Sequence, residues 1–224
     1  MSAPQTPIPY RLADRIRDAI VTGRYRPGSA LREQSLESEY GASRGPVREA
    51  LRLLELRGLT VHEPRRGFRV RPYTAHTIEQ IYRLRAVLER HSVESLIGRD
   101  LAPLVARLEE SNRRMRGCFV ARDLAGYLQE NNTFHRLILD FTGNEPLRRP
   151  LEMLNEMAEP VRYALLARRL SKSRSLADHE RITGFLAAGQ ILDAARVTEA
   201  HILDRLPMAQ AAVAEYCRQS GTAP

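Results

Sequence analysis

The sequence predicts a mainly α-helical protein with two domains, and two observations support this. Over residues 10–71, three helical patterns are followed by two short alternating runs around a turn, which indicate a β-hairpin. Beyond residue 75, apolar residues recur at helical spacing, and short loops join the segments as in an antiparallel helical bundle. We therefore assign an N-terminal domain to residues 1–72, a linker to 73–76, an all-α domain to 77–217 and a disordered tail to 218–224.

The composition is that of a folded globular protein. Of the 224 residues, 43% are hydrophobic and 28% are charged, which suits a chain with a sizeable core. No apolar run approaches the roughly 18 residues that a membrane span needs, and the N-terminus lacks the pattern of a secretory signal. Cys118 and Cys217 are far apart and have no metal-type spacing, so a reducing cytoplasm is the simplest location.

The first two helices of the N-terminal domain are marked by apolar spacing and by glycine. Leu12 and Ile16 begin an apolar stripe at helical spacing, and Gly23 ends that helix. The stretch RPGSAL is typical of a turn. Residues 33–40 then form a short helix that stops at Gly41.

The third helix has one apolar face and one basic face. Ser43 is a favourable N-cap, and Pro46 falls in the first turn, where proline is tolerated. Arg44, Arg48 and Arg52 recur at i, i+4 and i+8 opposite the apolar stripe. Such a helix can pack with one face while its N-terminal residues meet base edges in a DNA major groove. The apolar stripe consists of Val47, Ala50, Leu51 and Leu54.

Positive charge is concentrated in this N-terminal domain. Residues 1–72 hold 14 Arg against 8 Asp and Glu, which is +6 of the net +8 of the chain. Arg65 and Arg66 stand at the tip of the predicted hairpin beside Gly67, which would allow a sugar-phosphate backbone to approach closely. Charge alone is compatible with a basic but idle surface. The helices, the arginine row and the basic hairpin together predict a winged helix-turn-helix that binds DNA.

The all-α domain carries polar residues on helix faces that should be apolar. His135 lies in the apolar stripe of its helix, with Asn131 one turn before it, and His179 and His201 lie on inner faces of two later helices. A single inward histidine is more often a satisfied core residue. Three imidazoles with one oxygen donor instead suit a transition ion such as Zn²⁺ or Ni²⁺. The helical segments are 75–98, 101–117, 121–142, 146–170, 174–188 and 190–216.

Arg85 is a further inward polar residue, between Ile81 and Leu88 on an otherwise apolar stripe. A guanidinium inside a helical bundle needs an anion. An internal carboxylate such as Glu89 is one candidate partner, and the carboxylate of a bound small molecule is the other. Arg85 and Asn131 are therefore candidate ligand contacts.

The N-terminal domain resembles the GntR family of bacterial transcriptional regulators through the stretch IVTGRYRPGSALREQSLESEYGASRGPVREALRLLELRGL. The resemblance implies that Arg44 and Arg48 contact bases. It also implies phosphate contacts at Ser43 and the backbone near Pro46, and a minor-groove contact at Gly67. Gln34 stands where some members of the family have Arg. Gly45 stands where the common form of the motif has Thr. The candidate DNA contacts are Gln34, Ser43, Arg44, Gly45, Pro46, Arg48, Arg52, Arg65, Arg66 and Gly67.

The all-α domain resembles the FCD class of the FadR subgroup through LRAVLERHSVE, FHRLILDFTGNEPL and DHERITGFLAAGQILDAARVTEAH. Many members hold a metal with one Asp and three His, and here Asn replaces that Asp and brings no negative charge. The site then binds its metal more weakly, needs a carboxylate from the ligand, or is a metal-free pocket that binds an organic acid directly. The implied ligand set is Asn131, His135, His179 and His201.

These features predict a ligand-responsive bacterial transcriptional regulator. We expect a homodimeric repressor that binds a short palindromic operator in double-stranded DNA, with an affinity that a small carboxylate metabolite changes. It should act in the cytoplasm, at the nucleoid. The alternatives are a metal-dependent hydrolase with a nucleic-acid-binding head and a nonspecific DNA-binding protein. No acidic residue stands in the spacing of a hydrolytic metal site, so we do not expect an enzyme.

Overall fold

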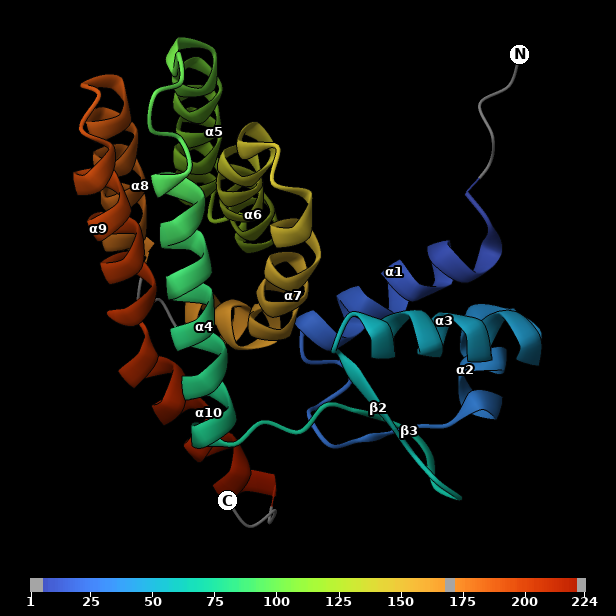
Figure 1. Ribbon diagram of the computed structural model, residues 1–224. Helices are drawn as coiled ribbons and strands as arrows, with labels where there is room; N and C mark the ends of the chain where they lie inside the picture. The colour runs from blue at the N-terminus through green and yellow to red at the C-terminus, as the bar shows by residue number, and fades with distance from the viewer. Residues whose placement is uncertain (1–5, 168–171, 221–224) are drawn as a thin grey trace, which may run out of the picture. The chain divides into compact units, whose positions relative to one another are not determined.

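The computed structural model describes residues 6–167 and 172–220, and most of these residues are helical (Figure 1). The chain divides into two compact units between Tyr73 and Thr74. The prediction of a mainly α-helical fold with a small N-terminal sheet is confirmed. Cys118 is a free thiol, whereas the side chain of Cys217 lies outside the described residues.

The N-terminal unit combines helices with an antiparallel sheet whose strand order is β1-β3-β2. We predicted a turn for RPGSAL, but Ala30 and Leu31 within it form β1 and pair with Arg69 and Phe68 of β3. A strand of two residues is too short to show alternation, so the pattern could not reveal it. The elements are α1 (Ile8–Val21), β1 (Ala30–Leu31), α2 (Glu33–Tyr40), α3 (Arg44–Leu56), β2 (Thr60–Glu63) and β3 (Gly67–Val70).

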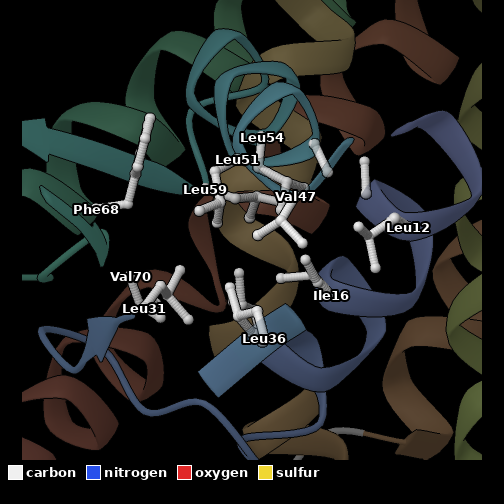
Figure 2. Packing of buried hydrophobic residues seen from close by; sticks show 13 residues of the cluster. Leu12, Ile16, Leu31, Leu36, Val47, Leu51, Leu54, Leu59, Phe68 and Val70 are labelled. Carbon is white, nitrogen blue, oxygen red and sulfur yellow. The ribbon is translucent and has the colours of Figure 1, made fainter. Parts of the chain in front are cut away.

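The apolar stripes of α1, α2 and α3 meet the sheet in one core, which Figure 2 shows from close by. Ile16 of α1, Leu51 of α3 and Val70 of β3 have no exposed surface. Burying each such side chain contributes about 1.5–3 kcal/mol, so this packing fixes which face of α3 turns inward. The opposite face of α3 is left to the solvent.

The C-terminal unit is a helical bundle. The helix α4 packs against α9 and α7, and α5 packs against α6 and α8. Thr74 caps α4, because its hydroxyl oxygen accepts a hydrogen bond from the Thr77 N–H at 3.0 Å. The helices are α4 (Ala75–Glu94), α5 (Ala102–Ala121), α6 (Leu124–Thr142), α7 (Glu145–Ala167), α8 (Lys172–Ala187), α9 (Ile191–Leu203) and α10 (Leu206–Ser220).

The predicted segment 190–216 is two helices rather than one. Pro207 has no N–H, and its ring would clash with the carbonyl of Leu203, so the helix breaks between α9 and α10. The segment 101–117 instead runs on for one turn, and it ends where Arg122 adopts a left-handed conformation with φ of 59°.

Smaller differences concern the joints. Residues 75–76, which the domain assignment put in the linker, lie in the first turn of α4, as the helical segment 75–98 predicted, and α8 begins at Lys172, two residues before the predicted segment 174–188. Residues 218–220 of the predicted disordered tail continue α10, and 221–224 lie outside the described residues. No helix in the described ranges has both the length and the apolar character needed to cross a bilayer.

Candidate functional site

The helix α3 divides its side chains as the sequence predicted. Its four apolar stripe residues are fully buried. Arg44, Arg48 and Arg52 are exposed, with 73% and 48% of the first two side chains accessible. A rigid helix thus presents a row of guanidinium groups, which match guanine edges and phosphates in a bidentate way.

The start of α3 has three features that the sequence did not reveal. Glu33 at the start of α2 pairs with Arg44 at 2.9 Å and with Arg48 at 3.8 Å, so one carboxylate contacts both arginines. Ser43 occupies the N-cap position, but its hydroxyl makes no capping hydrogen bond. Gly45 faces open space, and a Cβ added there would meet no atom within 4 Å.

The turn between β2 and β3 forms the wing. Arg65 and Arg66 are exposed at its tip, and Arg65 has an unusual positive φ of 66°. Gly67 follows with φ of 80°, a conformation that glycine adopts without strain. Gln34 is exposed on α2 and Pro46 is partly buried in the first turn of α3. The positively charged candidates on α3 and on the wing are therefore all exposed.

In the helical unit, three histidines from three helices converge. His135 of α6, His179 of α8 and His201 of α9 are buried, and one ring nitrogen from each lies within 4.8 Å of the other two. The Nε2 atoms of His135 and His179 are 3.3 Å apart. Two nitrogens that bind one tetrahedral Zn²⁺ are roughly 3.3 Å apart, because each Zn–N bond is about 2.0–2.1 Å. The His135–His179 pair thus has the spacing of two ligands of one ion, and His201 lies near enough for the three to form a candidate metal site.

Two of these imidazole rings contact a carboxylate through Nδ1, the ring nitrogen other than Nε2. His135 Nδ1 lies 2.5 Å from a Glu89 carboxylate oxygen, and His201 Nδ1 lies 3.2 Å from Asp178. This arrangement places the ring proton on Nδ1 and leaves the Nε2 lone pair for a ligand, as in carboxylate–histidine–metal sites. The pKa values of His179 and His201 are far below 6.5, chiefly because burial disfavours the charged form.

Asn131 lies beside this cluster, but its oxygen points elsewhere. Its amide nitrogen lies 3.3 Å from His179 Nε2, and its oxygen accepts a hydrogen bond from Arg162 of α7. Arg162 also donates to the oxygen of Asn132 at 2.8 Å. Burial, followed by the charge of Arg85, lowers the pKa of Arg162 to about 10, so this guanidinium remains a cation at neutral pH.

A small cavity of about 40 Å³ adjoins the cluster. Arg85 donates to Glu89 at 2.8 Å, but its Nε, like the hydroxyl of Tyr82, has no hydrogen-bond partner among the described residues. Burial would raise the pKa of Glu89, but its interactions with His135 and Arg85 hold it below its usual range. The cavity lining includes Tyr82, Arg85, Asn131, Arg162, His201 and Arg205.

Comparison with known proteins assigns each of the two units to a protein family. Residues 10–70 match the bacterial regulatory proteins of the gntR family, and residues 80–204 match the FCD domain. The chain belongs to the GntR family of transcriptional regulators, with an FCD domain. GntR regulators bind DNA operators and small-molecule effectors, commonly as dimers. The family and its relatives are regulators and not enzymes, so the hydrolase alternative finds no support.

Individual relatives agree with this GntR assignment. YdhC of Bacillus subtilis, described as an uncharacterized HTH-type transcriptional regulator, is 33% identical and covers 67% of this chain and 69% of its own. The Escherichia coli repressor GlaR is 26% identical over 89% of this chain and 94% of its own. A solved GntR regulator from Rhodococcus sp. RHA1 superimposes with a TM-score of 0.76 at 26% identity, over 92% of this chain and 99% of that one.

The residues that sequence reasoning missed in this GntR protein are the partners of the inward groups. Arg162 was detectable, because it lies four residues from Ala158 and from Leu166, which are both buried on the same stripe of α7. Asp178 had no such signal, since it precedes His179 and faces His201 of another helix. Asp204, three residues after His201, instead pairs with Arg174 in an exposed contact.

Proposed function

We propose that this GntR regulator is a ligand-responsive repressor that binds a short inverted-repeat operator as a homodimer. The observation that carries the DNA-binding part is the division of α3. One face is fully buried and the other presents three exposed arginines in a row. A dimer of such heads reads two half-sites, so the operator mirrors the two-fold symmetry of the protein.

The proposed contacts follow from the exposure of each side chain. Arg44 and Arg48 read base edges, while Ser43 and the helix start bind phosphate with amides that no capping bond occupies. Arg52 and Gln34 lie on exposed surfaces of α3 and α2 and complete the major-groove contact. The basic wing binds the backbone or the minor groove through Arg65, Arg66, and Gly67.

The proposed effector is a small carboxylate bound in the cavity beside the three histidines. Among the described residues, neither the buried Arg85 Nε nor the Tyr82 hydroxyl has a hydrogen-bond partner, and a carboxylate would supply an acceptor to both. Asn131 and Arg162 stand on the same lining. His135, His179 and His201 hold a divalent transition ion of the Zn²⁺ or Ni²⁺ type, which would supply a positive charge and open coordination positions for the ligand.

The ligand acts on DNA binding through a difference in its affinity for DNA-competent and DNA-incompetent states. A selection from random DNA, followed by fluorescence anisotropy at about 150 mM salt, tests the proposal. We expect an inverted repeat to be enriched and bound as a dimer, and small carboxylates to release it. Equal binding of random DNA at that salt concentration would favour the nonspecific alternative instead.

A further inference from the structure

The helix α4 exposes apolar side chains on the face opposite its buried charges. Arg85 and Glu89 are almost fully buried on its inner face, whereas Leu84 and Val87 have 49% and 56% of their surface exposed. A helix on the surface of a monomer normally has the reverse pattern. Arg85 and Glu89 belong to the site beside the histidines, but that role does not account for Leu84 and Val87.

The helix α7 continues this apolar surface beside α4. Leu88 at the edge of α4 packs against Leu147 and Leu151 of α7, so the two helices lie side by side (Figure 1). Met153 of α7 is 40% exposed. It precedes Arg162 by about two and a half helical turns, so it points away from α6, to which Arg162 donates. The surface that we call the α4/α7 face consists of Leu84, Val87, Leu88 and Met153.

The arginines beside the apolar residues of α4 are already paired within the chain. Arg83 pairs with Glu79 at 2.8 Å, and Arg90 pairs with Glu94 and with Glu199 of α9, also at 2.8 Å. Two copies of the α4/α7 face can therefore approach each other without placing unpaired like charges opposite each other. This pairing matters because a two-fold contact brings the same surface together from both sides.

The size of the α4/α7 face also suits a second copy of the chain. The 20 residues of α4 span about 30 Å, and two adjoining helices are about 20 Å wide, so the face covers up to roughly 600 Å². That area reaches the low end of the roughly 600–1,000 Å² that each partner contributes to a stable interface. A second copy is also available in every solution of the protein, and GntR regulators are commonly dimers.

We propose that the α4/α7 face is the surface through which two copies of this chain dimerise. Leu84 and Val87 of each copy lie against α4 and α7 of the other, and their burial stabilises the pair. The contact shares α4 with the effector site, because the same helix carries Arg85 on its inner face. This inference rests on the proposed homodimer and specifies its surface.

The test measures the mass of the full-length protein by sedimentation velocity over a range of concentrations. We expect the wild type to sediment as a dimer, with twice the chain mass of 25.4 kDa. Val87→Glu should weaken dimerisation by at least about 100-fold, because a two-fold contact buries the new charge twice. Leu84→Glu should have a similar effect, since Leu84 lies one turn away on the same face.

Leu192→Glu is the matched control for these variants. Leu192 is 56% exposed, as Val87 is, but it lies on α9, outside the α4/α7 face. The same change there should leave the dimer intact. Circular dichroism and thermal unfolding establish that each variant is folded.

The masses of the variants decide whether this surface is the interface. Folded Val87→Glu and Leu84→Glu proteins that remain as dimeric as the wild type would overturn the inference. It would also fail if these variants lost thermal stability but kept the dimer mass, because another part of the same chain would then cover the face. Dissociation of Leu192→Glu alone would assign the contact to α9 instead.

The mass of the wild type separates this inference from the proposed function. A wild type that is monomeric at every concentration, with and without operator DNA, would reject the homodimer itself and the surface with it. A dimeric wild type with dimeric Val87→Glu and Leu84→Glu variants would leave the homodimer standing and reject only the α4/α7 face.

Discussion

The two compact units bury different kinds of side chain. The core of the N-terminal unit is apolar, and Thr60 is its only fully buried polar residue in the described part of the chain. The interior of the helical unit instead contains charged and ligating groups from five helices, α4 and α6 to α9. These groups include Arg85, Glu89, Asn131, His135, Glu159, Asp178, His179 and His201.

This difference in buried side chains indicates that the two interiors have different roles. Apolar packing stabilises the N-terminal unit and fixes the orientation of its arginines. Buried charges seldom add stability, since apolar side chains of similar volume often replace them at no net cost. We propose that recognition of a ligand accounts for the polar interior of the helical unit, and the following experiments separate packing from recognition.

The largest effect should come from breaking the buried ion pair of the helical unit. Glu89→Leu leaves Arg85 buried without its carboxylate, and we expect the free energy of unfolding to fall by about 3–5 kcal/mol. Adding Arg85→Met should recover part of this loss, because an apolar pair can fill the same space while His135 Nδ1 still lacks the Glu89 acceptor. Urea titrations measure both values. A Glu89→Leu protein as stable as the wild type would contradict the prediction.

A cavity in the N-terminal core should have a slightly smaller effect. Leu51→Ala removes a fully buried side chain from α3, and we expect a loss of about 2–5 kcal/mol in the free energy of unfolding of that unit. Leu56→Ala is the matched control, because Leu56 lies on the same helix with 73% of its surface exposed. In the same urea titration, Leu56→Ala should lower the free energy of unfolding by no more than about 0.5 kcal/mol. Equal losses in the two variants would refute the packing argument.

Arg48→Ala should affect DNA recognition without affecting either core. Losing one bidentate base contact costs about 1–3 kcal/mol, which corresponds to about 5- to 150-fold weaker operator binding. Fluorescence anisotropy at fixed salt measures this loss, and Arg136→Ala, an exposed change on α6, is the control. If the Arg48→Ala protein keeps the full preference for the operator, the proposal that α3 reads the DNA sequence is wrong.

Acidification should destabilise the metal-free helical unit. The folded pKa values of His179 and His201 lie well below 6.5, so below pH 6.5 the unfolded chain binds protons that the folded chain does not. Stability is therefore full above pH 6.5 and falls by up to about 1.4 kcal/mol per histidine per pH unit below it. Urea midpoints at pH 8, 6.5 and 5.5 measure the slope, and His179→Gln should reduce it. A urea midpoint that rises as the pH is lowered would contradict this prediction.

Periodicity in the sequence predicted where most of the helices lie and the inward faces of several of them, but it merged α9 and α10 into one helix. Leu51 and His135 both lie on the predicted inner faces, because a spacing of three or four residues places side chains on one side of a helix. Such a pattern describes one helix at a time. It predicted that the three histidines point inward, and the fold decided that they meet.

The remaining features depend on contacts between distant segments. Arg162 reaches Asn131 across 31 positions of the chain, and Asp178 reaches His201 across 23, so no local spacing links them. The strand β1 exists only because β3 lies beside it. The break before Pro207 could have been predicted, since proline cannot extend a helix at that point.

The contact of Glu33 with Arg44 and Arg48 has a consequence for how selectively the proposed DNA contacts form. A long arginine side chain normally loses up to about 2 kcal/mol of rotamer freedom when it is fixed. Here both side chains are already restricted by one carboxylate before DNA arrives. The pair is exposed and therefore weak, so a guanine or a phosphate can displace Glu33 readily. In the DNA complex proposed above, α3 would meet the operator with these two arginines already placed beside Glu33, while the same carboxylate would compete with polyanions that offer no better contact.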